Sequence, residues 1–156
     1  MKRFFYCVVI ASAFYGCTTN PPQVGTAADL ASLEQTSKLI HAAFAKGDVK
    51  EVMKFHHPDV VKALDYNTFL NGRNAVAVNL AGTFKSFKLE FIGNKVEDVY
   101  FEGQTATQIN LFTIRGTPKA GGPPFIFKGR AMVEYVRYRD SPTGWASIRE
   151  VVQPAP

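Results

Sequence analysis

Apolar residues recur at helical spacing from residue 30 onwards. Leu30, Leu33, Ile40 and Phe44 are separated by three, seven and four positions, so they share one face of an α-helix. Polar residues stand between them. The pattern predicts a helix that runs to about residue 46 and ends at Gly47, because glycine readily adopts the left-handed conformation of a helix C-cap.

Two further helices are predicted before the pattern changes. Asp48 and Glu51 have the spacing of a capping box, which predicts a short helix with Phe55 on its apolar side and its end at Pro58. Residues 73–84 have the pattern of a third helix, whose apolar side chains can pack on a sheet. All three predicted helices therefore precede the region that is rich in β-branched and aromatic residues.

From residue 88 the pattern is that of β-strands, with alternation of period two at its start. The predicted strands cover residues 88–92, 96–101, 106–115, 125–139 and 145–152. Gly93-Asn94 and residues 140–144 are predicted to be turns, and the proline- and glycine-rich residues 117–124 a loop. Helices followed by antiparallel strands indicate an α+β fold with the helices on one face of the sheet.

The first seventeen residues have the layout of a secretory signal. Lys2 and Arg3 precede an almost wholly apolar run at residues 4–15, and Cys17 directly follows Gly16. This segment resembles a bacterial lipoprotein signal, in which the cysteine is acylated and becomes the new N-terminus. The resemblance implies a protein of the cell envelope that faces the periplasm and is attached to a membrane, the outer membrane among the candidates, through a lipid on Cys17.

Plain secretion is the alternative, because the tripeptide at residues 11–13 is an Ala-x-Ala cleavage site. The apolar run is shorter than the roughly 20 residues that a membrane-spanning helix needs. We therefore divide the chain into a signal peptide at residues 1–16, a lipid-anchored tether at residues 17–26 and a domain at residues 27–156. The domain has the length of one compact unit and is too short for two.

Charge and cysteine content exclude several classes of function. Lys2 and Arg3 account for two of the five net positive charges, and the other basic residues are scattered rather than clustered, so nucleic-acid binding is not expected. Cys7 leaves with the predicted signal and acylation consumes Cys17. The mature domain then has no thiol for nucleophilic catalysis or for a thiolate metal site. No motif in the sequence implies a cofactor.

Three short segments resemble the NTF2-like superfamily, which includes SnoaL-like and ketosteroid-isomerase-like proteins. Residues 45–49 look like its helix-breaking Gly-Asp step, residues 55–60 like the segment that enters its first strand, and residues 71–76 like the start of its third helix. The resemblance spans about residues 28–152. It implies N-terminal helices packed on a strongly curved antiparallel β-sheet, the NTF2-like or cystatin-like cone, with a central pocket.

The resemblance also suggests residues for the pocket. Those expected to line it are Ile40, Phe44, Phe55, Met132, Glu134 and Val136. Isomerase-like members use an aspartate base, a buried acid and a tyrosine; Asp65 lies one residue from the position of the base, and Glu134 falls at that of the acid. Ile40 stands where the tyrosine would be. Asp65 and Glu134 are therefore weak catalytic candidates, and their alternative roles are a solvated loop acid and an ion-pair partner of Arg130 or Arg149.

The three histidines do not have the spacing of a metal site. His56 and His57 are adjacent and His41 is distant, so we interpret them as helix-end and surface residues, and no metal is expected.

Three classes of function remain open for this sequence. They are a non-catalytic protein that binds a small apolar or amphipathic molecule, a protein-interaction module that dimerises through the open face of the sheet, and an isomerase- or cyclase-like enzyme. An open apolar pocket would favour the first and a pocket filled by aromatic side chains the second, whereas an inward carboxylate with a hydrogen-bonded partner would favour the third. The sequence favours a non-catalytic role.

Overall fold

The computed structural model describes residues 25–155, which form three helices and one six-stranded sheet. In chain order the elements are α1 (Ala27–Lys46), α2 (Val49–Met53), β1 (His56–Ala63), β2 (Phe69–Asn71), α3 (Arg73–Ser86), β3 (Phe87–Glu102), β4 (Thr105–Pro118), β5 (Phe125–Arg137) and β6 (Trp145–Pro154). The strand order is β2-β1-β6-β5-β4-β3. All neighbouring strands are antiparallel except β1 and β6, which are parallel.

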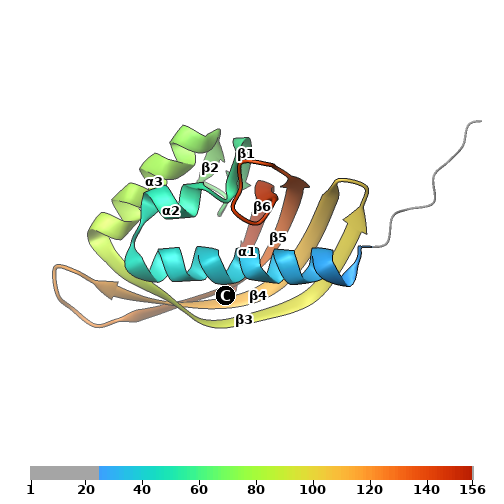
Figure 1. Cartoon of the computed structure of the whole chain (residues 1–156). Coiled ribbons are helices and arrows are strands. Elements are labelled where there is room, and N and C mark those ends of the chain that lie inside the picture. The colour runs from blue at the N-terminus through green and yellow to red at the C-terminus, as the bar shows by residue number, and fades with distance from the viewer. Residues whose placement is uncertain (1–24, 156) are drawn as a thin grey trace, which may run out of the picture.

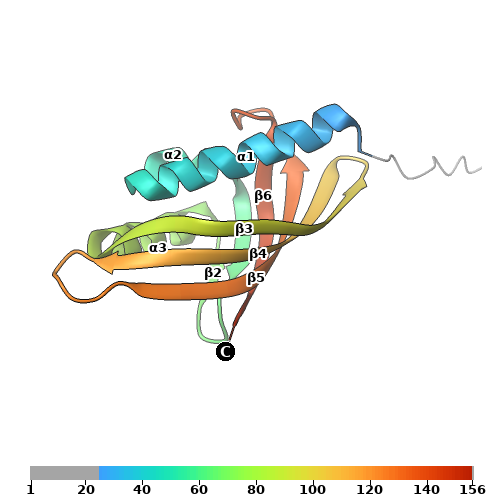
Figure 2. The same cartoon turned by 90° about the horizontal axis from the view of Figure 1, so that it is seen from below.

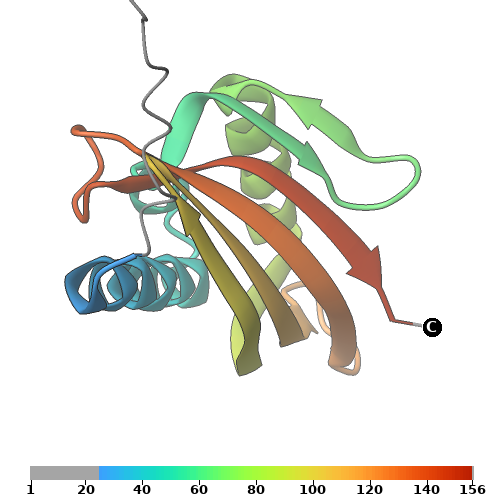
Figure 3. The same cartoon turned by 90° about the vertical axis from the view of Figure 1, so that its right-hand side faces the viewer.

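The sheet curves strongly, and α1 and α3 lie against its concave face (Figures 1 and 3). Figure 2 shows the three longest strands, β3, β4 and β5, running side by side beneath α1. The predicted α+β fold, with helices on one face of a curved and mainly antiparallel sheet, is therefore confirmed. Among residues 25–155 no helix is long and apolar enough to cross a membrane.

Helix α1 has the ends that its sequence predicts. The Thr26 hydroxyl accepts a hydrogen bond from the backbone N–H of Asp29, and the Asp29 carboxylate accepts one from the backbone N–H of Thr26. At the other end Gly47 has a φ of 68° and closes the helix. Leu33 and Ala43 are buried on the face that meets the sheet. The caps set the two ends of α1, and its buried residues set the face that packs on the sheet.

The short helix α2 ends earlier than predicted. Its last residue is Met53, and the chain enters β1 at His56, two residues before Pro58. Pro58 lies where the pairing of β1 with β6 is irregular, between His56 and Val61, so its missing N–H interrupts no regular ladder. The residue pattern predicted neither β1 nor β2, and the expectation that all strands follow the helices is wrong, because both strands precede α3. Strand β2 is three residues long and pairs only with β1.

Strand β3 runs without a turn where one was predicted. Gly93 and Asn94 stay in the ladder opposite Thr113 and Phe112 of β4, so the predicted turn at this dipeptide is wrong. The register instead shifts between Phe91 and Gly93, and again between residues 96 and 98. Such bulges bend a strand and increase its twist. They explain how one sixteen-residue strand follows the curved sheet.

Candidate functional site

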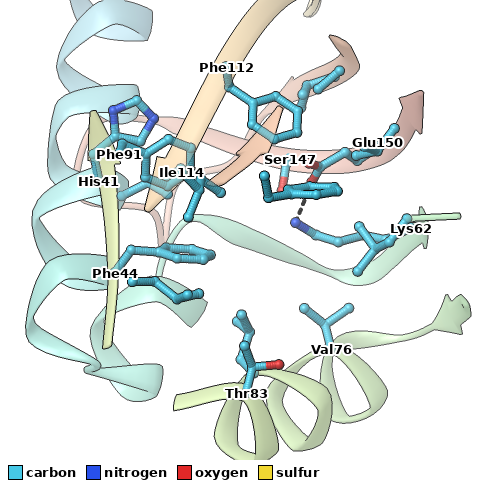
Figure 4. A pocket seen from close by; sticks show the side chains of 18 of the residues that line it. His41, Phe44, Lys62, Val76, Thr83, Phe91, Phe112, Ile114, Ser147 and Glu150 are labelled. Atoms are coloured by element: carbon cyan, nitrogen blue, oxygen red, sulfur yellow. Dashed lines mark hydrogen bonds and ion pairs between the residues drawn. The ribbon is translucent and has the colours of Figure 1, made fainter. Parts of the chain in front are cut away.

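A cavity of about 380 Å³ lies between the helices and the concave face of the sheet. Its walls are mainly apolar and come from α1, α3 and all six strands; among the apolar residues are Ile40, Phe44, Leu80, Phe91, Phe112, Ile114, Val133 and Val152. Figure 4 shows side chains from both helices and the sheet converging on it. This volume is within the range of about 300–1,000 Å³ that is typical of small-molecule sites.

The cavity contains some of the residues that the sequence suggested. Ile40 and Phe44 of α1 line it. Phe55 is fully buried, but it lies in the core and not in the cavity wall. The aromatic side chains around Phe44 contact one another: its ring meets that of Phe91 edge-on, with 5.5 Å between ring centroids. Helix α1 therefore supplies one apolar wall, as expected.

The predicted face of β5 is the wrong one. The residues of β5 that line the cavity are Phe125, Phe127, Ala131, Val133 and Tyr135. The alternate residues that were expected there are Met132, Glu134 and Val136. Met132 is 49% exposed, and Glu134 stands opposite Arg149 of β6 in the register of the sheet. Because side chains alternate along a strand, an offset of one residue moves the whole set to the other face.

Asp65 lies at the edge of the cavity, but its carboxylate is engaged in the turn between β1 and β2. It accepts hydrogen bonds from the backbone N–H groups of Asn67, at 2.7 Å, and Thr68, at 2.8 Å, and from the Thr68 hydroxyl, at 2.9 Å. The bond from Asn67 contributes most to lowering the pKa of Asp65 below its usual value, and those from Thr68 add to it. Asp65 thus stabilises its own turn and is a poor base.

An inward carboxylate is present at a position that the sequence analysis did not single out. Glu150 of β6 forms an ion pair with Lys62 of β1, and both side chains line the cavity (Figure 4). The Lys62 side chain is 12% exposed and the Glu150 side chain 18%. The two residues are direct partners in the parallel ladder of β1 and β6. The pair places both charges in the polar part of an otherwise apolar cavity.

His56 is a second unexpected cavity residue. It is 2% exposed, so its interpretation as a surface histidine is wrong. Burial, followed by the charge of Lys62, lowers its pKa well below 6.5. Its Nδ1 lies 3.0 Å from the carbonyl oxygen of Val52 and, in the neutral ring, donates its proton to it. Nε2 is then a hydrogen-bond acceptor, and it has no partner among the described residues.

The other two histidines have different surroundings. His41 lines the cavity and stacks on Phe91 with 3.9 Å between ring centroids; burial lowers its pKa. His57 contacts the ring of Tyr138 at 5.1 Å, outside the cavity. Within residues 25–155 no group of three His, Cys, Asp or Glu side chains could hold a metal ion.

Tyr135 supplies the phenol that Ile40 cannot provide. Its side chain lines the cavity, as does that of Ser37 of α1. Burial raises the pKa of Tyr135, and the negative charge of Glu150 raises it further, so the phenol stays protonated. In the sheet, Ser147 is the direct neighbour of both Tyr135 and His56. The polar groups of the cavity therefore come from adjacent strands.

Comparison with known proteins bears on the fold. No family model and no curated protein matches the chain. Among solved structures, a conserved protein from Planctomyces limnophilus is similar with a TM-score of 0.74 and 19% identity, over 83% of this chain and all of the other. A ketosteroid isomerase-like protein from Erwinia carotovora atroseptica has a TM-score of 0.69 and 16% identity, over 84% of this chain and 100% of its own.

A third similar structure names the fold. It is a nuclear transport factor 2 (NTF2-like) superfamily protein from Salmonella enterica serovar Typhimurium, with a TM-score of 0.69 and 15% identity, over 83% of this chain and 94% of the other. Identities this low show shared architecture and leave the activity undetermined. The arrangement of helices, the curved sheet and these structural neighbours agree with the resemblance found in the sequence. The chain has the NTF2-like cone fold.

Proposed function

We propose that the cavity binds a small amphipathic molecule. The observation that carries this proposal is a cavity of about 380 Å³ whose walls are apolar and one part of which holds polar side chains. Cavities with a few converging polar groups are typical ligand sites, because the walls bury the apolar part of a ligand and the polar groups orient it. Since aromatic side chains do not fill the cavity, this feature favours ligand binding over a role in protein interaction alone.

Filling the cavity should weaken ligand binding. Thr83 of α3 points into the cavity (Figure 4), so Thr83→Trp places an indole where the ligand would lie. We expect binding of the neutral fluorescent probe N-phenyl-1-naphthylamine to weaken by about 10- to 100-fold, the equivalent of a 1–3 kcal/mol overpacking cost. The measurement is a fluorescence titration of the purified protein.

A matched control distinguishes occupancy of the cavity from a general effect of tryptophan. Val78 lies on the same helix, is 65% exposed and does not line the cavity, so Val78→Trp should bind the probe as the wild type does. Thermal unfolding of both variants checks that the fold is kept. Equal probe binding by the wild type and Thr83→Trp would contradict the proposal.

A second candidate function is proton transfer, which Glu150 and His56 favour. Glu150 is an inward carboxylate with a hydrogen-bonded partner, which is the feature expected of an enzyme. Its carboxylate, however, already accepts a hydrogen bond from the ammonium of Lys62. His56 is the more available base, because it is neutral and its unpartnered Nε2 belongs to a cavity-lining side chain, but its lowered pKa makes it a weak one. The protonated phenol of Tyr135 is available to stabilise a developing oxyanion.

This candidate is tested with β-tetralone, whose α-protons exchange with deuterium when a base removes them. If the cavity is catalytic, the protein accelerates exchange measured by NMR in D₂O, and His56→Gln slows it by about 100-fold or more, the contribution of a general base. Asp65→Asn is the control, because that carboxylate serves the turn. Exchange at the uncatalysed rate in the wild type would leave the non-catalytic function as the conclusion.

The place of the domain in the cell remains a proposal from the sequence, since residues 1–24 lie outside the described residues. We expect Cys17 to carry the lipid that attaches the protein to an envelope membrane. Cys17→Ser should then move the protein from the membrane fraction to the soluble fraction, whereas Cys7→Ser, within the predicted signal, should not. Retention of Cys17→Ser in washed membranes would contradict the anchor. The homodimer and the tether at residues 17–26 stay predictions from the sequence.

A further inference from the structure

Buried polar atoms without partners gather at the cavity. Four such side-chain atoms occur among the described residues: His56 Nε2, Gln108 Oε1, Asn110 Oδ1 and Ser147 Oγ. Three of these side chains line the cavity, and only that of Gln108 does not. A buried polar atom without a hydrogen bond destabilises the fold, because it has lost its hydrogen bonds to water without gaining others. Because three of the four atoms belong to side chains that line one cavity, a ligand bound there can supply their missing hydrogen bonds.

The chemistry of these atoms specifies what the ligand must offer. His56 Nε2 accepts, because the proton of the ring lies on Nδ1 and is donated to the Val52 carbonyl oxygen. Asn110 Oδ1 is a carbonyl oxygen and also accepts, whereas the Ser147 hydroxyl can accept or donate. Acceptors therefore dominate, and a ligand must bring hydrogen-bond donors to satisfy them.

The charges in the cavity restrict the ligand further. A carboxylate has no proton to donate, and because Lys62 and Glu150 already pair with each other, neither offers a charged ligand an unpaired opposite charge. An ammonium would add a positive charge near Lys62 and Arg73, whose charges already disfavour protonation of His56. An uncharged hydroxyl carries a donor without either penalty.

We infer that the cavity selects an uncharged, hydroxyl-bearing amphipathic molecule, whose hydroxyl donates a hydrogen bond to His56 Nε2 and whose apolar body packs against the aromatic walls. This inference rests on the proposed function. It specifies the chemical class of the ligand, an aliphatic or aromatic alcohol. Ser147 is the direct neighbour of His56 in the sheet, so one hydroxyl group can donate to the imidazole and accept from the serine.

A matched series of compounds that each carry a ten-carbon chain tests this selectivity. Competition against N-phenyl-1-naphthylamine gives the affinities of 1-decanol, methyl decyl ether, decanoate and decylamine for the purified protein. We expect 1-decanol to bind about 5- to 100-fold more tightly than the ether, because the ether leaves the buried acceptors without a donor. Decanoate and decylamine should also bind less tightly than 1-decanol.

Three variants test whether the unpartnered polar atoms cause the preference for 1-decanol over the ether. His56→Leu should reduce the preference for 1-decanol over the ether to less than about twofold, and Asn110→Leu should reduce it in part. Asn110→Leu keeps the inference testable if His56→Leu does not fold. Gln108→Leu is the matched control, since it removes an unpartnered buried acceptor outside the cavity and should leave the preference unchanged.

The outcomes separate this inference from the function on which it rests. Binding of the probe and of all four compounds, without preference for the alcohol, would overturn the inference and retain the ligand-binding function. Tighter binding of decanoate or decylamine than of 1-decanol would overturn it in the same way. Absence of binding by the probe and by all four compounds would overturn both.

Discussion

Replacing Lys62 by methionine is expected to destabilise the folded domain by about 3 kcal/mol, at the lower end of the effect of breaking a buried ion pair. The substitution leaves the Glu150 carboxylate without its partner at a position where the side chain is only 18% exposed. The Coulombic attraction that offsets the desolvation of both charges is then lost. Urea unfolding at pH 7 measures the change in the free energy of unfolding.

The double variant Lys62→Met, Glu150→Leu shows whether the loss arises from the unpaired charge. Removing both charges together removes the desolvation cost as well, so we expect stability within about 1 kcal/mol of the wild type. The exposed pair of Lys54 and Glu51 is the control: both side chains are at least 40% exposed, and Lys54→Met should change stability by no more than about 0.5 kcal/mol. A double variant less stable than Lys62→Met would contradict this account.

If the double variant is as stable as expected, the ion pair has another use in the cavity. A hydrophobic pair would then serve the fold equally well, and the charged pair would be retained for what it does to a bound molecule. The ammonium of Lys62 helps to keep His56 neutral, and the carboxylate of Glu150 helps to keep Tyr135 protonated. The pair thus preserves an acceptor on β1 and a donor on β5, the two strands that flank β6.

The sequence predicted the architecture well, because local patterns determine it. The helical spacing of Leu33 and Ile40 and the glycine at position 47 define α1 without any knowledge of the sheet. Bulges depend on partners and were missed: Gly93 and Asn94 are typical of a turn, but pairing with β4 keeps them in an extended strand. Local preference was overridden there by a long ladder of backbone hydrogen bonds.

The cavity residues were harder to predict, because both faces of β5 carry apolar side chains. Met132 and Val136 on one face look as suitable for a core as Ala131 and Val133 on the other. The alternation of period two was clear, but it did not show which set faces inward. Only the packing of α1 and α3 on one side of the sheet decides that question.

The polar groups of the cavity depend on contacts between residues far apart in the sequence. Lys62 and Glu150 meet because β1 runs parallel to β6, and no local pattern predicts the register of that pairing. His56 was placed at a helix end, but α2 stops at Met53, and the next residues carry the imidazole into the sheet. The adjacent pair His56-His57 gave one usable signal: neighbouring residues of a strand point to opposite faces, so one of the two would face inward.

Lowering the pH below 6.5 is expected to destabilise the domain through His56. The pKa of His56 in the folded protein is well below its ordinary value of 6.5, because burial and the charge of Lys62 oppose protonation. Below pH 6.5 the unfolded chain therefore binds a proton that the folded chain does not. The stability that His56 contributes is present above pH 6.5, and it is lost at up to about 1.4 kcal/mol per pH unit as the pH falls.

Urea unfolding at several pH values between 7 and 5 measures this slope in the wild type and in two variants. His56→Gln keeps a side chain that can donate to the Val52 carbonyl oxygen but does not titrate, so its stability should fall less steeply with decreasing pH. His41→Gln should reduce the slope over a narrower range just below pH 6.5, because the pKa of His41 is lowered less than that of His56. An unchanged slope in His56→Gln would mean that the buried imidazole takes up its proton in the folded state. The acceptor on which the proposed alcohol site depends would then be absent in mildly acidic solution.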